Sequence, residues 1–502
     1  MKIVLINVPS RKGKAGFWLP LGLLYAASII ERCGHKPIIV DPYIDDVDLK
    51  KFDSGDFSVI DAALSLHKPV VVGFGGIATS YPRTKKLSRY IKEKYPRTLQ
   101  IVGGPLASVY ELLLTKSDVD VVFHGETEVS LPVFLEKVGT NGPFSDVPGI
   151  SYLQDGKLSK TQMPEQVKDL DSIPMPSCGL LDIDKYIFTA GDRLVHYKQF
   201  HKDHVLYDTV EKKIGDKSRY LPIVTSRGCT HRCSFCYRHV KGIRQHSVGY
   251  VIKFIKFLKD KYKIDGLQFG DELFNSDPAW VMEFCDALER EKIDIFYFVV
   301  GARISKIDEK MLKRLKETGC VDISYGQESG SDVILKEYGK GVTRRQNTDI
   351  TLLTTKKVGI PNTVQLVIGS PSETNETIAD TIQFLKDVEA YNYSLNYLIP
   401  LPGTPVWKHV EEKNMIKDIE KYLGVVAESG GEPIVNLTKE TDSVWRNWKY
   451  RIRKEMKMHY YKKTNMLYYH IYKTVHKITD VTTPLISQRI KRFIPRWLRR
   501  LY

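Results

Sequence analysis

Residues 226–238, SRGCTHRCSFCYR, hold three of the seven cysteines in this chain of 502 residues. Cys229, Cys233 and Cys236 are separated by three residues and then by two, and Phe235 comes directly before the last of them. An odd number of cysteines, with three in one short stretch, argues against a disulfide framework. The stretch therefore predicts a metal-binding or redox site.

The spacing of the cysteines separates the kinds of site that remain. A structural zinc site usually takes two pairs of ligands; no second cysteine pair follows here, although His231 or His239 would supply a fourth ligand. A catalytic dithiol needs only the C-x-x-C of Cys233 and Cys236, which leaves the third cysteine unexplained. An iron–sulfur cubane held by three thiolates keeps one iron open for a chelating substrate or cofactor.

The sequence after residue 220 alternates between strand-like and helical patterns. Strand-like runs occur at 222–226, 266–270, 295–302, 321–326, 363–369 and 395–401, with helical patterns at about 247–262, 278–291, 308–318, 344–357 and 375–390. Six such units, two short of eight, predict a partial TIM-type (β/α)6 barrel over residues 221–410, open on one side. The cysteines follow its first strand, at the carboxyl end where barrel active sites are built.

The first 140 residues show an earlier series of strands and helices. Apolar runs at 2–8, 36–41, 69–75, 98–104 and 119–125 alternate with helical patterns at 21–34, 81–94, 106–116 and 127–138. This order predicts a doubly wound, Rossmann-like α/β domain over residues 1–140, with ligands at the carboxyl ends of its strands. Glycines follow three of these strands: Gly73, Gly75, Gly76, Gly103, Gly104 and Gly125. They suit either a closely approaching ligand or tight turns.

Two further regions complete the predicted α/β fold. Residues 141–220 contain a hairpin pattern at 150–160, around Asp155 and Gly156, followed by a linker. Residues 411–502 form a helical region that ends in a basic, aromatic tail.

The motif C-x₃-C-x-Φ-C, with Phe235 as the aromatic Φ, resembles the hallmark of the radical S-adenosylmethionine (radical SAM) superfamily. The resemblance implies a [4Fe–4S] cluster ligated by Cys229, Cys233 and Cys236 on a partial barrel. It also implies that the open iron binds the amino and carboxylate groups of SAM. Reduction of SAM would then yield a 5′-deoxyadenosyl radical.

The ends of the later strands also resemble this superfamily. FGDELF (269–274), ARIS (302–305), YGQESGSD (325–332) and IGSPSET (368–374) end successive strands, and LIPLPGTPVW (398–407) contains a Pro-Gly-Thr-Pro turn. Singly, each also suits ordinary turn chemistry. The resemblance implies that SAM is bound by Phe235, Asp271, Glu272, Arg303, Glu328, Ser329 and Ser331.

The N-terminal domain resembles the cobalamin-binding domain of one subgroup of that superfamily. The matching segments are 18–41, GFGGIATS (73–80), IVGGPLAS (101–108) and FHGETEVSLP (123–132). The resemblance implies that cobalamin is bound by Thr79, Ser80, Gly103, Gly104 and Gly125. One departure is that residues 7–18 lack the D-x-H-x-x-G motif, so we expect no axial histidine.

The net charge of +15 is concentrated at the C-terminus. Residues 446–502 hold 16 lysines and arginines against two acids, whereas residues 1–445 hold 59 against 58. Because tryptophan and tyrosine are interleaved with these charges, we expect peripheral contact with an anionic membrane. RNA binding is less favoured, and docking onto the protein's own body or an acidic partner is a further alternative. The sequence shows neither a signal peptide nor a membrane-spanning run. Apart from the expected membrane contact, the protein is therefore predicted to be cytoplasmic.

These features together predict a cobalamin-dependent radical SAM enzyme that needs an electron donor and acts on a small-molecule or lipid-linked substrate. C-methylation is the preferred reaction, and oxidative cyclisation, as in the anaerobic magnesium-protoporphyrin monomethyl ester cyclases, is the alternative. An RNA-modifying enzyme is disfavoured because Cys33 is the only cysteine before the linker. A non-catalytic corrinoid-binding sensor is disfavoured by the intact cysteine triad.

Overall fold

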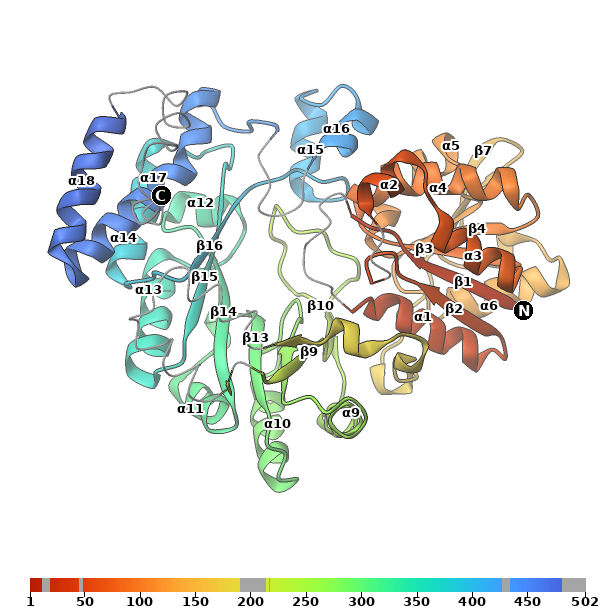
Figure 1. Ribbon diagram of the computed structural model, residues 1–502, viewed down its shortest axis with the longest axis horizontal. Coiled ribbons are helices and arrows are strands. Elements are labelled where there is room, and N and C mark those ends of the chain that lie inside the picture. The colour runs from red at the N-terminus through yellow and green to blue at the C-terminus, as the bar shows by residue number, and fades with distance from the viewer. Residues whose placement is uncertain (11–18, 45–47, 190–213, 216, 427–433, 481–502) are drawn as a thin grey trace.

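The computed structural model describes residues 1–10, 19–44, 48–189, 214–215, 217–426 and 434–480. Figure 1 shows two α/β units side by side, the N-terminal one at the right and the later one at the lower left. Helices α15 and α16 lie at the top between the units, and α17 and α18 lie on the outer side of the second unit. The predicted α/β fold class is confirmed.

The first sheet has seven strands in the order β2-β1-β3-β4-β5-β6-β7. Its parallel strands are β1 Lys2–Asn7, β2 Lys36–Val40, β3 Val71–Gly75, β4 Leu99–Gly103 and β5 Val121–Phe123. The predicted hairpin forms β6 Ile150–Gln154 and β7 Lys157–Lys160 and continues this sheet, because β6 pairs antiparallel with β5. The first structural unit therefore extends past the predicted boundary at residue 140.

Helices cover both faces of the first sheet, which explains why its strands are continuous apolar runs. They are α1 Leu21–Arg32, α2 Leu49–Ser54, α3 Ser58–His67, α4 Tyr81–Lys94, α5 Tyr110–Lys116 and α6 Ser130–Thr140. The α1 side shares one continuous hydrophobic core with the second unit.

The second sheet has the order β16-β15-β14-β13-β12-β9-β8. Its strands are β8 Phe188–Thr189, β9 Arg219–Ile223, β12 Gly266–Phe269, β13 Phe296–Ala302, β14 Cys320–Glu328, β15 Asn362–Ile368 and β16 Tyr393–Tyr397. The six strands from β9 to β16 are parallel, and β8 pairs antiparallel with β9. This arrangement is the predicted open, partial barrel.

The barrel helices follow the strands in turn. They are α9 Val248–Tyr262, α10 Pro278–Arg290, α11 Glu309–Glu317, α12 Asp332–Glu337, α13 Arg344–Leu352 and α14 Asn375–Asp387. A separate antiparallel ribbon, β10 Ser226–Gly228 paired with β11 Ile243–Gln245, projects from the carboxyl end of β9. The cysteine loop, residues 229–242, connects the two strands of this ribbon.

The C-terminal region is helical, with α15 Pro405–Glu412, α16 Ile419–Val425, α17 Asp442–Thr464 and α18 Met466–Asp480. Helix α17 packs on the barrel and buries Trp445, Trp448 and Ile452 in a core with β15, β16 and α14. These tryptophans therefore serve internal docking, as one of the alternatives proposed, rather than a membrane or RNA. The Arg/Trp-rich tip at 488–502 lies outside the described residues. No helix in the described ranges is long and apolar enough to span a membrane.

Candidate functional site

The cysteine loop is held closed at its base by a close backbone approach. Gly228 has φ +87°, and a Cβ there would lie 2.4 Å from the carbonyl oxygen of Gly242, so only glycine fits. Farther along the loop, the N–H of Ser234 donates to the carbonyl of Tyr338 at 3.1 Å. The ring of Phe235 packs edge-on against that of Tyr338, with centroids 5.1 Å apart. Phe235 therefore anchors the loop to the barrel.

The three cysteines differ in exposure but share this one loop. Cys233 is buried, Cys229 is half-buried and Cys236 is exposed, and all three are free thiols. Burial raises the pKa of Cys233, whereas the nearby ammonium of Lys340 acts to lower it. Across the described part of the chain, no three His, Cys, Asp or Glu side chains converge on a point that would hold a single metal ion.

A cubane cluster makes a different demand on its ligands. Each thiolate binds a separate iron, so the three sulfurs surround the cluster instead of converging on one ion. Three free cysteines on one anchored loop at a strand's carboxyl end supply such a donor set. The residues present therefore fit a [4Fe–4S] cluster with one open iron.

The acidic pair at the end of β12 has two separate positions. Asp271 is buried, and its Oδ1 accepts from the backbone N–H groups of Thr225 and Ser226 at 2.7 and 2.5 Å and from both of their hydroxyls. Asp271 therefore ties β12 to the start of the ribbon β10. Glu272 is exposed, so of the two predicted SAM ligands it is the one free to face a ligand.

The predicted SAM residues of the next strands are partly engaged by the protein itself. Nε of Arg303 donates to Oγ of Ser305 at 2.7 Å. The hydroxyl of Ser329 lies 3.2 Å from that of Thr381 and accepts from the N–H of Ser331 at 3.1 Å. Ser329 and Ser331 are both buried, which indicates that they shape this strand end.

Lys340 is a residue that the sequence motifs did not indicate. Its ammonium lies 3.1 Å from Oε1 of Glu328, and its charge also acts on Cys229 and Cys233. Glu328 has φ +62°, an uncommon backbone conformation for a residue with a side chain. A lysine twelve positions after a strand end carries no local signal, because only the fold brings it to the cysteine loop.

The predicted cobalamin residues lie at or just after the carboxyl ends of β3, β4 and β5. A Cβ on Gly103 would meet only Cγ2 of Thr127, at 3.9 Å, so space is open beside this backbone. Gly104 and Gly125 have φ +74° and +69°, where L side chains are strained. The open space beside Gly103 fits the close approach of a large flat ligand, whereas the positive φ of Gly104 and Gly125 is also what a tight turn requires.

Thr79 and Ser80, which are also predicted to bind cobalamin, lie in the turn after β3. Both are almost fully buried. The hydroxyl of Ser80 donates to the carbonyl oxygen of Val8 at 3.2 Å, so its proton is not available to a cofactor in this structure. Ser80 instead links β1 to the turn after β3, a contact between distant residues that the sequence motif does not reveal.

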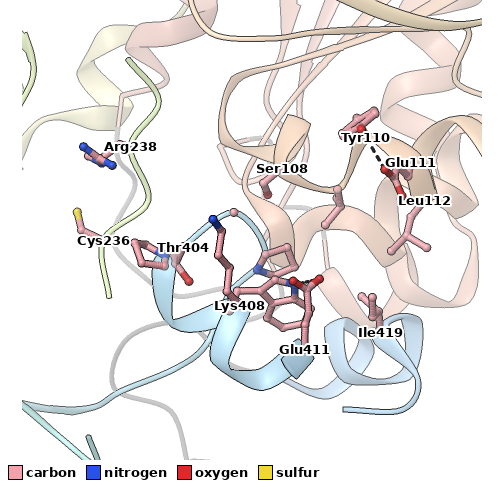
Figure 2. A pocket seen from close by; sticks show the side chains of 15 residues that line it. Ser108, Tyr110, Glu111, Leu112, Cys236, Arg238, Thr404, Lys408, Glu411 and Ile419 are labelled. Carbon is pink, nitrogen blue, oxygen red and sulfur yellow. Dashed lines mark hydrogen bonds between the residues drawn. The ribbon is translucent and has the colours of Figure 1, made fainter. Parts of the chain in front are cut away.

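The carboxyl ends of the two sheets face each other across the interface. A Cβ on Gly403 would lie 2.7 Å from the ring of Tyr237 and 3.2 Å from Cβ of Ser108, so the turn after β16 touches both the cysteine loop and the first unit. A cavity of about 500 Å³ opens there, and Ser108, Cys236 and Lys408 are among the residues that line it (Figure 2). The cavity is therefore bordered by a cysteine predicted to hold the cluster.

Comparisons with known proteins agree with this geometry. Residues 223–385 match the radical SAM superfamily, and residues 14–135 match the B12-binding domain. An uncharacterised methyltransferase of Pyrococcus horikoshii is 28% identical over 83% of this chain and 84% of its own length. The anaerobic magnesium-protoporphyrin IX monomethyl ester cyclase of Rubrivivax gelatinosus is 24% identical over 84% of this chain and 72% of its own length.

A solved structure shows the same arrangement of domains. The cobalamin-dependent S-adenosylmethionine radical enzyme OxsB, with aqua-cobalamin and S-adenosylmethionine bound, superposes with a TM-score of 0.61 at 18% identity. The match covers 90% of this chain but only 61% of that one. This protein is a radical SAM enzyme. It belongs to the subgroup that carries an N-terminal B12-binding domain, whose cofactors are a [4Fe–4S] cluster, SAM and cobalamin.

Proposed function

We propose that this enzyme methylates an unreactive carbon of a small molecule, with cobalamin as the methyl carrier and SAM as the source of the radical. The observation that carries the proposal is the contact between the two carboxyl-end surfaces. Gly403, after the last barrel strand, lies against both Tyr237 of the cysteine loop and Ser108 of the cobalamin-type unit. A radical generated at the loop and a methyl group carried by the first unit would therefore meet in one cavity.

When bound, the cluster supplies an electron for SAM cleavage, and cobalamin supplies a transferable methyl group. We assign the cluster to Cys229, Cys233 and Cys236, with Lys340 placing a positive charge beside the first two. Glu272 would accept hydrogen bonds from the amino group of SAM. Gly103 and Gly104 would let the tail of the corrinoid approach the backbone. The cavity walls would shield the reacting carbon from water.

Relatives support the choice of methylation. Besides the methyltransferase of P. horikoshii, the hopanoid C-3 methylase of Methylococcus capsulatus is 25% identical over 79% of this chain and 69% of its own length. The cyclase of R. gelatinosus supports oxidative cyclisation as the second candidate.

Isotopic labelling separates the two reactions. The loaded, reduced enzyme is incubated anaerobically with a small-molecule extract and SAM that carries a labelled methyl group. Methylation predicts a new product that contains the label. A product that loses hydrogen without gaining the label would favour the cyclase instead.

We also propose that the C-terminal region contacts an anionic membrane, which would suit a lipid or lipid-linked substrate. The start of α18 exposes Met466, Leu467 and Tyr468, and Lys462 and Lys463 lie in the last turn of the preceding helix. Six further arginines and lysines and no acids occur in residues 481–502. Apolar and basic side chains together favour an anionic lipid surface.

Vesicle co-sedimentation tests this contact with the full chain and with a chain that ends at Asp480, because α17 is part of the core and has to be kept. Vesicles that contain phosphatidylserine should retain the full chain more strongly than the shortened one, which keeps Met466, Leu467 and Tyr468 but loses the six basic residues of 481–502. Equal retention of both chains, or retention by neutral vesicles, would contradict a contact through this tail.

A further inference from the structure

Two arginines face each other across the ribbon that carries the cysteine loop. Arg227 of β10 is the direct partner of Arg244 of β11 in the antiparallel register. Their side chains are only 17% and 13% exposed. Like charges directly opposite each other on paired strands destabilise the pairing, and burial makes this repulsion stronger. The ribbon therefore needs negative charge from outside itself.

The first unit supplies that charge from the segment after β5. Oε1 of Glu126 lies 3.1 Å from Nη1 of Arg227, and Oε2 of Glu126 lies 2.8 Å from Nη1 of Arg244. Oε1 also accepts from Nη2 of Arg244 at 2.8 Å, so the contact with Arg244 is bidentate. Glu128 lies 2.5 Å from Nη1 of Arg227. Two carboxylates of one unit thus neutralise two arginines of the other.

The surroundings of these four charged side chains hold them in place. The side chains of Glu126 and Glu128 are 8% and 6% exposed. The guanidinium of Arg227 also lies 4.8 Å from the ring centroid of Tyr25 in α1, which is a cation–π contact. Burial alone would raise the pKa of Glu126, but the two arginines hold it below its usual value. Each member would be a buried, uncompensated charge without the others.

The position of these ion pairs links them to both predicted cofactor sites. Arg227 stands two residues before Cys229 in the sequence, at the base of the cysteine loop. Glu126 directly follows Gly125, one of the glycines at the carboxyl edge of the first sheet. The same ion pairs therefore connect the start of the cysteine loop with the segment that we assign to cobalamin.

We propose that Glu126 and Glu128 are positioning residues for the iron–sulfur cluster: by neutralising Arg227 and Arg244, they hold the ribbon β10–β11, and with it the cysteine loop, in register. The proposal rests on the assignment of the three loop cysteines as cluster ligands. It makes the N-terminal unit a part of the cluster site as well as the carrier of cobalamin. Docking of that unit and order in the cysteine loop are then coupled.

Hydrogen–deuterium exchange of the full-length, metal-free chain tests the coupling directly. The variants are Glu126→Gln, which keeps the shape and removes the charge, and Glu126→Gln combined with Arg244→Gln, which removes one charge of each sign. We expect exchange over residues 229–242 to rise about threefold or more in the single variant. It should return toward the wild-type rate in the double variant, because the repulsion between the facing arginines is gone.

Two further measurements separate positioning from general stability. Iron retained under a chelator after anaerobic loading should fall in Glu126→Gln and recover in the double variant. Glu128→Gln removes only one contact of Arg227, so it should give a smaller effect in the same direction. This milder variant provides the test if Glu126→Gln does not fold. Glu136→Gln on the exposed face of α6 is the matched control and should behave as wild type.

Unchanged exchange over residues 229–242 in a folded Glu126→Gln chain would overturn the proposal, as would a double variant no better than the single one. Both exchange results are independent of SAM cleavage and of cobalamin. An error in the proposed methylation would therefore leave them untouched.

Discussion

The ammonium of Lys340 lies 3.1 Å from the carboxylate of Glu328, and both side chains are largely buried, at 18% and 9% exposure. The pair stands at the carboxyl end of β14, beside the cysteine loop, and the charge of Lys340 acts on Cys229 and Cys233 as well. Glu328, which is predicted to bind SAM, is thus paired with a lysine whose charge acts to lower the pKa of Cys233, one of the cysteines that we assign to the cluster.

Replacing Lys340 with methionine should therefore destabilise the protein and the cluster together. Removing one partner of a buried ion pair costs about 3–5 kcal/mol, because the other charge stays buried and uncompensated. The free energy of unfolding in urea gives the measurement. Lys313→Met is the matched control, since its pair with Glu309 lies at the surface and should contribute far less than a buried pair. Equal losses in the two variants would contradict a buried, coupled pair.

Two glycine substitutions test the assigned cobalamin site. A Cβ fits beside Gly103 in the protein alone, where the nearest atom is 3.9 Å away. If the corrinoid tail packs there, Gly103→Ala should weaken cobalamin binding about tenfold, or about 1.4 kcal/mol, with little change in thermal stability. At Gly75 the added Cβ would lie 2.7 Å from Leu23. Gly75→Ala should therefore lower thermal stability, in contrast to Gly103→Ala. Cobalamin affinity unchanged by Gly103→Ala would count against this assignment.

Glu373 should make stability depend on pH. It is almost fully buried, and burial raises its pKa from 4.5 to about 7, although the N–H groups of Gly369 and Ser370 oppose the shift. A raised pKa means that the protonated form is favoured in the folded chain. The stabilising contribution is therefore complete below pH 4.5 and is lost as the pH rises through about 7.

The variant Glu373→Gln removes this titration and keeps an acceptor for the N–H of Gly369. Its stability relative to wild type should increase between about pH 5 and pH 8, by up to about 3 kcal/mol. Thermal unfolding across this range gives the measurement. A stability difference that stays constant with pH would show that Glu373 titrates normally.

Alanine at each loop cysteine tests the assigned ligand set. Cys229→Ala, Cys233→Ala and Cys236→Ala should each lose most of the iron and the visible absorption of the anaerobically loaded protein, because the cubane then lacks a thiolate. Cys33→Ala, outside the loop, should retain both. Full iron binding by any of the three loop variants would remove that cysteine from the ligand set.

Local patterns in the sequence predicted most strands and their order, because buried parallel strands are short apolar runs that end in glycines or polar turns. The hairpin at 150–160 was predicted too, but not its pairing with β5, since no local pattern indicates which sheet an edge hairpin joins. The tryptophans of α17 were read as surface residues because composition does not reveal which helix face is covered. Burial of Trp445 and Trp448 comes from long-range packing on α14 and β16.

The residues of the candidate site also divide into those that the local sequence indicated and those that only long-range contacts reveal. The motif formed by Cys229, Cys233 and Cys236 was visible in the sequence, and its resemblance to the radical SAM hallmark led to their assignment as cluster ligands. The buried contact of Ser80 with Val8 was not predicted, because it is long-range. Long-range contacts also explain why Lys340 and Glu126 were missed. Each makes its contacts with residues of a distant part of the chain, so only the folded structure reveals them.

The central claim is that this chain cleaves SAM at a cluster held by the cysteine loop. Its most direct test is the quantity of 5′-deoxyadenosine formed when the anaerobically loaded and reduced protein is incubated with SAM. We expect the wild-type chain to form 5′-deoxyadenosine and Cys233→Ala to form none. No 5′-deoxyadenosine from a wild-type sample with a full, reduced cluster would contradict the claim.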